Sequence, residues 1–385
     1  MGVDHLQDEP KLILTYPHKS TFNRIGFSSM VSLSFIVLWI LNHLMSYNTD
    51  FSDKIIMAIV LVGAPLLIWF MGYYLFINGV KLEIYENNIV KYNYRVFDNH
   101  YFLYDNKLIQ RLRENLMKNF RFENIALIST KILSSQSYYH SFLTKLLSDR
   151  CVISNKGQEA NYLFPLYLYP DENSLTNEPV PNFNMDIIKD IEKSLNLNFG
   201  NWTLVQSLEK AGGTEVLLPK KEFQALDLFD YIYAVLHSPS YREKYKEFLK
   251  IDFPRVPYPK PETFWQLVSL GGKLRSLHLL EDTSLDERII DIKGEGELLI
   301  KNSLNKKDFS IEDEKVELRL NDEVSVVNIP LVAWEFYIGG YQPAQKWLKD
   351  RVGRVLNRAD MKHYNRIINA LCKTDLIMKK IDEVL

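Results

Sequence analysis

The chain of 385 residues contains only two cysteines, and neither belongs to a recognisable motif. Cys151 and Cys372 are far apart, and no cysteine or histidine follows either one at metal-ligand spacing. A disulfide framework is therefore excluded, and we expect reduced, structural thiols. The histidines are equally scattered, and we expect packing or capping roles for His140, His237, His278 and His363.

The chain also lacks an excess of positive charge. Lys and Arg number 46 and Asp and Glu number 48, which leaves a formal net charge of −2. A chain with this balance is not drawn to a polyanion as a whole, so any affinity for nucleic acid must come from a local basic patch.

Two motifs of nucleotide and methyl-transfer chemistry are missing. The sequence has no G-x-x-x-x-G-K-[S/T] phosphate loop, which excludes the usual P-loop ATPases and helicases. It has no Pro-Pro dipeptide, whereas an adenine methyltransferase holds its flipped base with an Asn/Asp-Pro-Pro-aromatic loop.

Two weaker patterns remain, and neither predicts a site. Residues 291–297 contain a glycine-rich turn, but a strand-like run follows at 298–300, where a cofactor-binding helix would have to begin. Residues 313–315 have acid-x-Lys spacing, which exposed charged loops often show. We therefore expect no catalytic residue, no metal ligand and no cofactor bound by this chain.

Charge is absent from two long apolar runs near the N-terminus, at 26–47 and 55–77. Each run reaches the length of about 20 residues that a helix needs to cross a bilayer. The sequence between the runs is acidic, whereas both outer flanks carry Lys and Arg, so both ends should face the cytoplasm. The runs predict a two-helix transmembrane hairpin in a bacterial inner membrane, although a buried soluble hairpin would also fit.

The remaining sequence predicts an α+β protein made of mixed strands and helices. We expect a short β-hairpin at 80–92, further strands at 124–133, 151–154, 164–169 and within 288–327, and helices at 106–120, 185–197, 226–236 and 360–381. Ser238 is expected to cap a helix that has Pro239 at its first position. A polar loop at 171–184 suggests a boundary, and we divide the chain into 1–91, 92–175 and 176–385.

The segment 334–351 is the most informative part of the chain. An aromatic run predicts a strand that stops at Gly339 and Gly340, and Pro343 then suits the first position of a helix. On that helix the apolar arc contains Ala344, Trp347, Leu348, Val352, Val355 and Leu356, and the opposite side carries Lys346 and Lys349, with Arg354 at its margin. The basic side is either a ridge that binds a polyanion or an ordinary solvated face.

Arg351 falls inside the apolar arc of the same helix. A buried arginine needs an acidic partner, because an unpaired buried charge is costly. Glu335 or Asp350 could supply the partner, so we predict a structural role for Arg351. A second basic helix, 106–120, adds Lys107, Arg111 and Arg113 to the candidate DNA-binding residues.

Six blocks of sequence, in order, resemble the C-terminal specificity region of type ISP restriction–modification enzymes and related single-chain adenine methyltransferase–nucleases. They are Y-R-V-F-D-N-H-Y at 94–101, F-P-L-Y-L-Y-P at 164–170, F-D-Y-I-Y-A-V-L-H-S-P-S-Y-R at 229–242, F-P-R-V-P at 253–257, G-K-L-R-S-L-H at 272–278, and the segment 334–351. Val96 and His100 replace the proline and arginine of the family's first block. The resemblance covers residues from about 92 to the end.

The resemblance implies sequence-specific recognition of duplex DNA by a target-recognition region. Catalysis and the binding of S-adenosylmethionine would then require a separate methyltransferase or nuclease polypeptide, or a missing domain. The family normally has a methyltransferase domain where this chain has residues 1–91, so those residues reflect either a fusion or a rearranged reading frame. In the second case the protein is expected in the cytoplasm. The alternative is a membrane-anchored protein whose C-terminal half binds a protein partner or has decayed.

Overall fold

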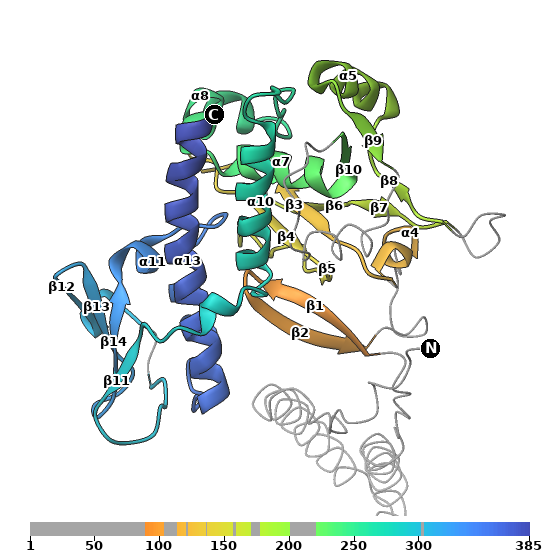
Figure 1. Ribbon diagram of the computed structural model, residues 1–385. Coiled ribbons are helices and arrows are strands. Elements are labelled where there is room, and N and C mark those ends of the chain that lie inside the picture. Colours follow the sequence, from red (N-terminus) through yellow and green to blue (C-terminus); the bar gives the residue numbers. More distant parts are fainter. Residues whose placement is uncertain are drawn as a thin grey trace, which may run out of the picture. The chain divides into compact units, whose positions relative to one another are not determined.

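The computed structural model describes residues 89–103, 114–120, 122–135, 137–156, 159–170, 178–200, 221–301 and 304–385 (Figure 1). Contacts divide the chain into Met1–Ile84 and Tyr85–Leu385, and every described residue belongs to the second unit.

Three helices run side by side through this unit: α7 (Ala225–His237), α10 (Phe264–His278) and α13 (Arg358–Val384) (Figure 1). The first two approach closely because Gly271 has no side chain, and a Cβ there would lie 1.9 Å from the Asp230 carbonyl oxygen. The last helix begins with a capping box, in which the Asn357 side chain accepts from the Asp360 amide at 2.9 Å.

Around α7 lie short sheets and helices. β3 (Ala126–Thr130) pairs with β4 (Ser141–Thr144) and with β6 (Asn161–Pro165), both antiparallel. The neighbouring elements are α4 (Glu114–Met117), η3 (Lys118–Phe120), β7 (Tyr167–Leu168), β8 (Val180–Pro181), α5 (Met185–Leu195), β9 (Asn198–Gly200), β10 (Glu222–Gln224), α8 (Pro239–Lys244) and α9 (Lys246–Leu249).

A four-stranded antiparallel sheet contacts α13 and has the order β11-β14-β13-β12. Its strands are β11 (Asp291–Lys293), β12 (Phe309–Glu312), β13 (Lys315–Arg319) and β14 (Ser325–Pro330), and η4 (Thr283–Asp286) and η5 (Lys306–Asp308) precede β11 and β12. Asp313 and Glu314 form the turn between β12 and β13, with φ of 48° and 57°, so this acidic pair serves a hairpin.

β1 (Ile89–Arg95) and β2 (Asp98–Leu103) form an antiparallel ribbon, and β5 (Leu147–Ser148) pairs with β1 in parallel. The turn of this β1–β2 ribbon, Val96 and Phe97, is buried in the core beside α13. Two short helices, α11 (Leu331–Glu335) and α12 (Pro343–Lys349), pack on α13 as well.

The fold class is α+β, as the sequence predicts. The helix over 185–197 is confirmed, and Ser238 caps α8 by accepting from the Tyr241 amide at 3.0 Å. The strand expected at 151–154 is wrong, because this segment is a turn. Val152 and Ile153 are buried there, but their carbonyl groups accept from Tyr341 and Gly340 and do not pair with a strand.

The predicted location in the inner membrane needs correction. Across the described ranges, no helix is both long enough and apolar enough to cross a membrane. The location prediction is therefore wrong for this part of the chain. The two predicted spans, 26–47 and 55–77, lie outside the described residues, as does most of the hairpin predicted at 80–92. Its residues 89–92 belong to β1 and pair with β2.

Candidate nucleic-acid interface

The glycine turn of segment 334–351 forms, but the strand before it does not. Trp334 lies in helix α11, and the only pairing near the turn is an isolated bridge between Ile338 and Tyr341. Gly339 has φ of +64°, and a Cβ there would lie 1.6 Å from the Ile153 carbonyl oxygen. Gly340 donates its amide to that same oxygen at 2.8 Å. The two glycines therefore let this turn pack against the backbone of residue 153.

Pro343 begins helix α12, as predicted, but the helix ends at Lys349 and does not continue to Leu356. The chain then turns at Gly353, with φ of +80°, and returns to bridge Leu299 through Val355. As a result Val352 and Val355 are exposed at 38% and 54%, whereas Ala344, Trp347 and Leu348 of the helix and Leu356 of the following loop are buried.

The predicted basic ridge is thereby broken into separate parts. Lys346 forms an ion pair with Asp350, and only 19% of its side chain is exposed. Lys349 is exposed and donates to the Gln345 side chain at 3.2 Å. Arg354 is also exposed, but it lies in the loop after the helix. Lys107, Arg111 and Arg113 lie outside the described residues.

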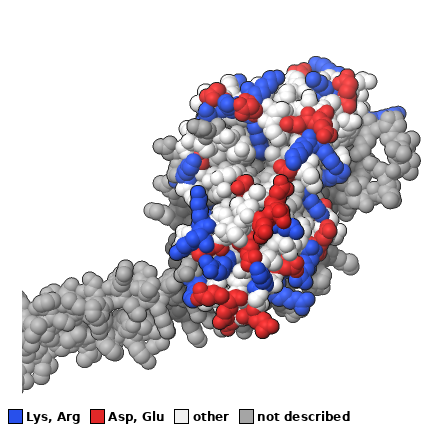
Figure 2. Space-filling view, turned by 90° about the vertical axis from the view of Figure 1, so that its left-hand side faces the viewer, with Lys and Arg blue, Asp and Glu red and all other residues white. Residues whose placement is uncertain are grey.

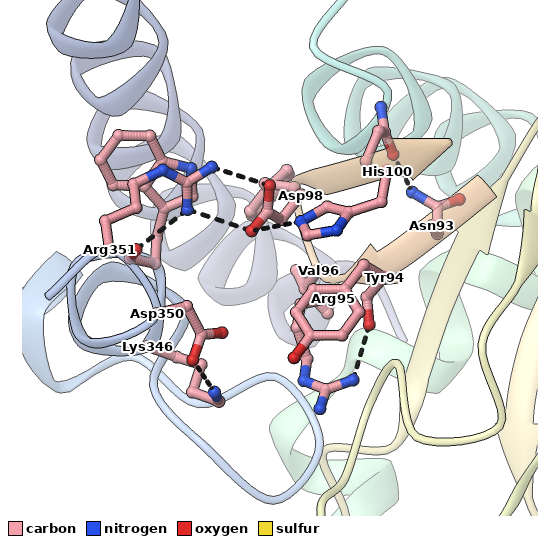
Figure 3. Close-up of polar contacts among 12 residues, drawn as sticks. Asn93, Tyr94, Arg95, Val96, Asp98, His100, Lys346, Asp350 and Arg351 are labelled. Carbon is pink, nitrogen blue, oxygen red and sulfur yellow. Dashed lines mark hydrogen bonds and ion pairs between the residues drawn. The ribbon is translucent and has the colours of Figure 1, made fainter. Parts of the chain in front are cut away.

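Arg351 pairs with Asp98 instead of Glu335 or Asp350. Its guanidinium donates to both carboxylate oxygens, at 3.0 and 2.8 Å (Figure 3). It also donates to the Trp347 carbonyl at 3.0 Å and lies 3.7 Å above the centre of the Trp347 ring. Since Asp98 is buried, this bidentate pair joins the first and last blocks of the resemblance inside the fold.

Two further side chains hold the turn of the ribbon. The Val96 amide donates to the Tyr341 hydroxyl at 3.0 Å, and that hydroxyl donates to the Val152 carbonyl. His363 of α13 donates from Nε2 to the Phe97 carbonyl at 2.8 Å. Burial lowers the pKa of His363, which favours the neutral ring. We call Tyr341, Arg351 and His363 the turn clamp.

The β1–β2 ribbon itself is the feature that sequence reasoning missed. The alternation of residues 89–95 and 98–103 could have indicated it, but only the structure shows that Lys91 lies opposite Tyr101 and Asn93 opposite Asn99. Asn99 and Tyr101 are exposed, and so is Lys91. The clamp therefore orients a ribbon whose outer residues are free to meet a partner.

Charges of both signs mix on the face that carries the β11–β14 sheet (Figure 2). Lys293 pairs with Glu317 at 3.1 Å and Lys301 pairs with Asp322. Among the described residues of that face, acidic partners neutralise much of the basic charge, so it is poorly suited to bind a polyanion.

The described part of the chain offers no constellation for metal chemistry, since no group of three His, Cys, Asp or Glu side chains could hold an ion. A cavity of about 360 Å³ lies between α7, β6 and residues 253–256. Its described lining is hydrophobic apart from Ser129 and Asn182, so it provides no titratable group for catalysis.

Comparison with known proteins identifies this fold. The family model for the type ISP C-terminal specificity domain matches residues 75–380. The chain belongs to this family. The specificity domain of this chain thus includes the ribbon, the turn clamp and all three long helices.

Two solved structures are similar to this specificity domain. The ATP-dependent type ISP restriction–modification enzyme LlaBIII, bound to DNA, has a TM-score of 0.53 and 16% identity over 76% of this chain and 18% of its own. The DrdV–DNA complex has a TM-score of 0.55 and 19% identity over 78% of this chain and 28% of its own. These likenesses show a shared fold, and this chain corresponds to less than a third of either protein. None of the curated proteins compared with the chain matches it.

Proposed function

We propose that this chain recognises a specific sequence of duplex DNA as the specificity part of a type ISP restriction–modification system. The observation that supports it is the family match over 75–380. Two of the sequence blocks on which the resemblance rests meet at the Asp98–Arg351 pair, which lies inside the matched region. DNA is also present in both similar structures.

Lys349 and Arg354 are the described candidates for contact with DNA phosphates, because both are exposed and neither forms an ion pair with a described acidic side chain. Lys346 suits this role less well, since Asp350 neutralises it. Lys107, Arg111 and Arg113 stay candidates on the sequence alone. We also retain the division of the recognition region into 92–175 and 176–385 as part of this proposal.

A salt-dependent binding titration with the full chain tests the proposal. We expect the logarithm of the binding constant for a mixed-sequence duplex to fall linearly with the logarithm of salt concentration. The Lys349→Ala/Arg354→Ala variant should weaken binding to every duplex and reduce the slope by about one for each lost contact. The matched control, Lys260→Ala/Lys273→Ala, removes two exposed lysines elsewhere and should not change the slope.

Sequence specificity needs a second measurement. Selection from duplexes with a randomised centre should enrich one motif, because base contacts and not phosphate contacts carry sequence information. If the full chain binds no duplex at low salt and enriches no motif, the proposed function is wrong.

We further propose that catalysis and S-adenosylmethionine binding belong to a methyltransferase or nuclease domain or polypeptide outside residues 1–385. The absence of a Pro-Pro dipeptide from the sequence supports this division of roles.

A further inference from the structure

One end of the β1–β2 ribbon is fixed inside the protein. Val96 and Phe97, at its turn, are 2% and 5% exposed. The turn clamp binds this end from α13, from the turn that follows α12 and from the loop before α12. Five hydrogen bonds thus set the direction in which the ribbon leaves the core. Arg351 donates to both Asp98 oxygens, and His363 donates to the Phe97 carbonyl. The Tyr341 hydroxyl accepts from the Val96 amide and donates to the Val152 carbonyl.

Aromatic contacts stiffen one face of the ribbon. The rings of Tyr92 and Phe102 meet edge to face with centroids 5.3 Å apart, and Tyr94 stacks on His100 at 4.4 Å. The Arg95 guanidinium lies 4.2 Å from the centre of the Tyr94 ring. Cross-strand pairs of this kind stabilise a two-stranded ribbon, so its other face keeps a defined shape.

That other face carries Lys91, Asn99 and Tyr101, all exposed. The Lys91 ammonium lies 5.8 Å from the centre of the Tyr101 ring and forms no ion pair with a described acidic residue. The one acidic residue of the ribbon, Asp98, is neutralised by Arg351. The ribbon therefore presents net positive charge, in contrast to the paired charges of the β11–β14 sheet.

Asn99 has a fixed amide orientation. The buried Asn93 donates from Nδ2 to Asn99 Oδ1 at 2.6 Å, and Thr144 in turn donates to Asn93 Oδ1. Asn99 Nδ2 consequently points away from this chain of hydrogen bonds, and none of the described residues accepts a hydrogen bond from it. A preoriented donor at the surface of a ribbon suits an acceptor on a base edge, such as guanine O6 or N7, adenine N7 or thymine O4.

We propose that the β1–β2 ribbon enters the major groove of duplex DNA, with Asn99 and Tyr101 at base edges and Lys91 at a phosphate. The proposal rests on the proposed function and names the element that reads the sequence. β5 pairs with β1 only at Tyr92 and Asn93, so the remaining length of the ribbon has two strands about 4.8 Å apart, which fit a groove about 12 Å wide. The turn clamp positions this element without touching DNA.

The test uses the full chain with two probes, a duplex library with a randomised centre and one mixed-sequence duplex for salt titration. Asn99→Ala/Tyr101→Ala should lose about tenfold or more of the preference at one or two positions of the selected motif. Its salt slope should not change. Lys91→Ala should weaken binding to all duplexes and reduce the slope by about one.

Asn99→Asp adds a variant that keeps the size of the side chain and the hydrogen bond from Asn93. It replaces the outward donor with an acceptor, so the preference at that position should move toward cytosine, whose N4 amine donates. The matched control is Tyr258→Ala/Lys273→Ala, which removes an exposed tyrosine and an exposed lysine outside the ribbon and should leave the motif intact.

The outcomes separate the two proposals. If the unaltered chain enriches a motif and both Asn99 variants enrich the same motif with equal affinity, the ribbon does not read DNA and the proposed function stands. If the unaltered chain binds and selects no duplex, the proposed function fails and the ribbon proposal fails with it.

Discussion

At the scale of single residues, the Asp98–Arg351 pair joins segments that lie 253 positions apart in the chain. The side chains are only 6% and 13% exposed, so water cannot replace either partner. The His100 Nε2 lies 3.9 Å from the Asp98 carboxylate, farther than the Arg351 guanidinium at 2.8 Å. The β1–β2 ribbon therefore needs this pair in order to pack on α12 and α13.

Arg351→Ala should lower the free energy of unfolding by about 3–5 kcal/mol, because it leaves the buried Asp98 carboxylate unpaired. Urea unfolding of the full chain measures this loss. Lys349→Ala, an exposed residue next to the same turn, is the control and should change stability by no more than about 0.5 kcal/mol. A loss below about 1 kcal/mol for Arg351→Ala would contradict the structural role.

Two glycines allow a second comparison. Gly339→Ala should destabilise the protein by more than about 2 kcal/mol, since a left-handed alanine is strained and its Cβ would meet the Ile153 carbonyl oxygen at 1.6 Å.

Gly353→Ala is the matched control, because its φ is also positive, at +80°, but nothing lies within 4 Å of the new Cβ. Only the backbone strain of about 1–2 kcal/mol should remain there. Equal losses for the two alanine variants would show that the contact at Ile153 is unimportant.

At the scale of elements, α7, α10 and α13 meet around buried polar groups. Arg275 of α10 donates to Asp230 of α7 at 2.8 and 3.0 Å, and burial raises the pKa of Asp230 to about 6 against the lowering effect of Arg275. His278 contacts both neighbouring helices, because its Nδ1 binds the Tyr233 hydroxyl and its Nε2 donates to Thr374 at 2.9 Å. These contacts fix the relative rotation of the three helices.

His278 predicts how this junction responds to acid. Burial lowers the pKa of His278 from 6.5 to about 3. Between these pH values, the unfolded chain binds a proton at His278 and the folded chain does not. The contribution of neutral His278 to the stability of the fold is therefore complete above pH 6.5 and is lost progressively as the pH falls toward 3. His278→Gln should lower stability at pH 8 but flatten the acid slope by up to about 1.4 kcal/mol per pH unit.

Urea unfolding at a series of pH values measures that slope. Thr374→Val is the control, since it removes a hydrogen-bond partner but keeps the buried ring, and its acid slope should persist. An unchanged slope in His278→Gln would mean that His278 is not the group that titrates.

At the scale of the whole molecule, the specificity domain should have no methyl-transfer activity by itself. The chain has no Pro-Pro dipeptide with which to grip a flipped adenine. Purified full chain, incubated with duplex DNA and radiolabelled S-adenosylmethionine, should incorporate no label above background. A known adenine methyltransferase run in parallel is the positive control. Methyl transfer by the chain alone would overturn the assignment of catalysis to a partner.

Much of the fold follows from local sequence. Caps and periodicity indicate α5, α7, α8 and most of α13, because Ser238 and Asp360 act through hydrogen bonds to nearby backbone groups. Alternation indicates the β11–β14 sheet in the same way. The six ordered blocks also predicted the family, which the match over 75–380 confirms.

Local sequence failed where a distant partner decided the outcome. The aromatic run before Gly339 is typical of a strand, but its first two residues end α11, whose Ala333 and Trp334 are buried in the core that also contains residues of α13. The helix after Pro343 ends early because the chain beyond Gly353 pairs with residues 298–300. The basic ridge depended on that longer helix.

By itself, then, the sequence determined the family, the α+β class, the Gly-Gly turn and the need of Arg351 for an acidic partner. Only the tertiary structure decided that the partner is Asp98, that Lys346 is neutralised by Asp350, and that Lys91, Asn99 and Tyr101 share one face of a clamped ribbon. The physical reason is how far apart along the chain the interacting groups lie. Caps and turns depend on groups a few residues apart, whereas ion pairs and shared faces depend on which distant segments the core brings together.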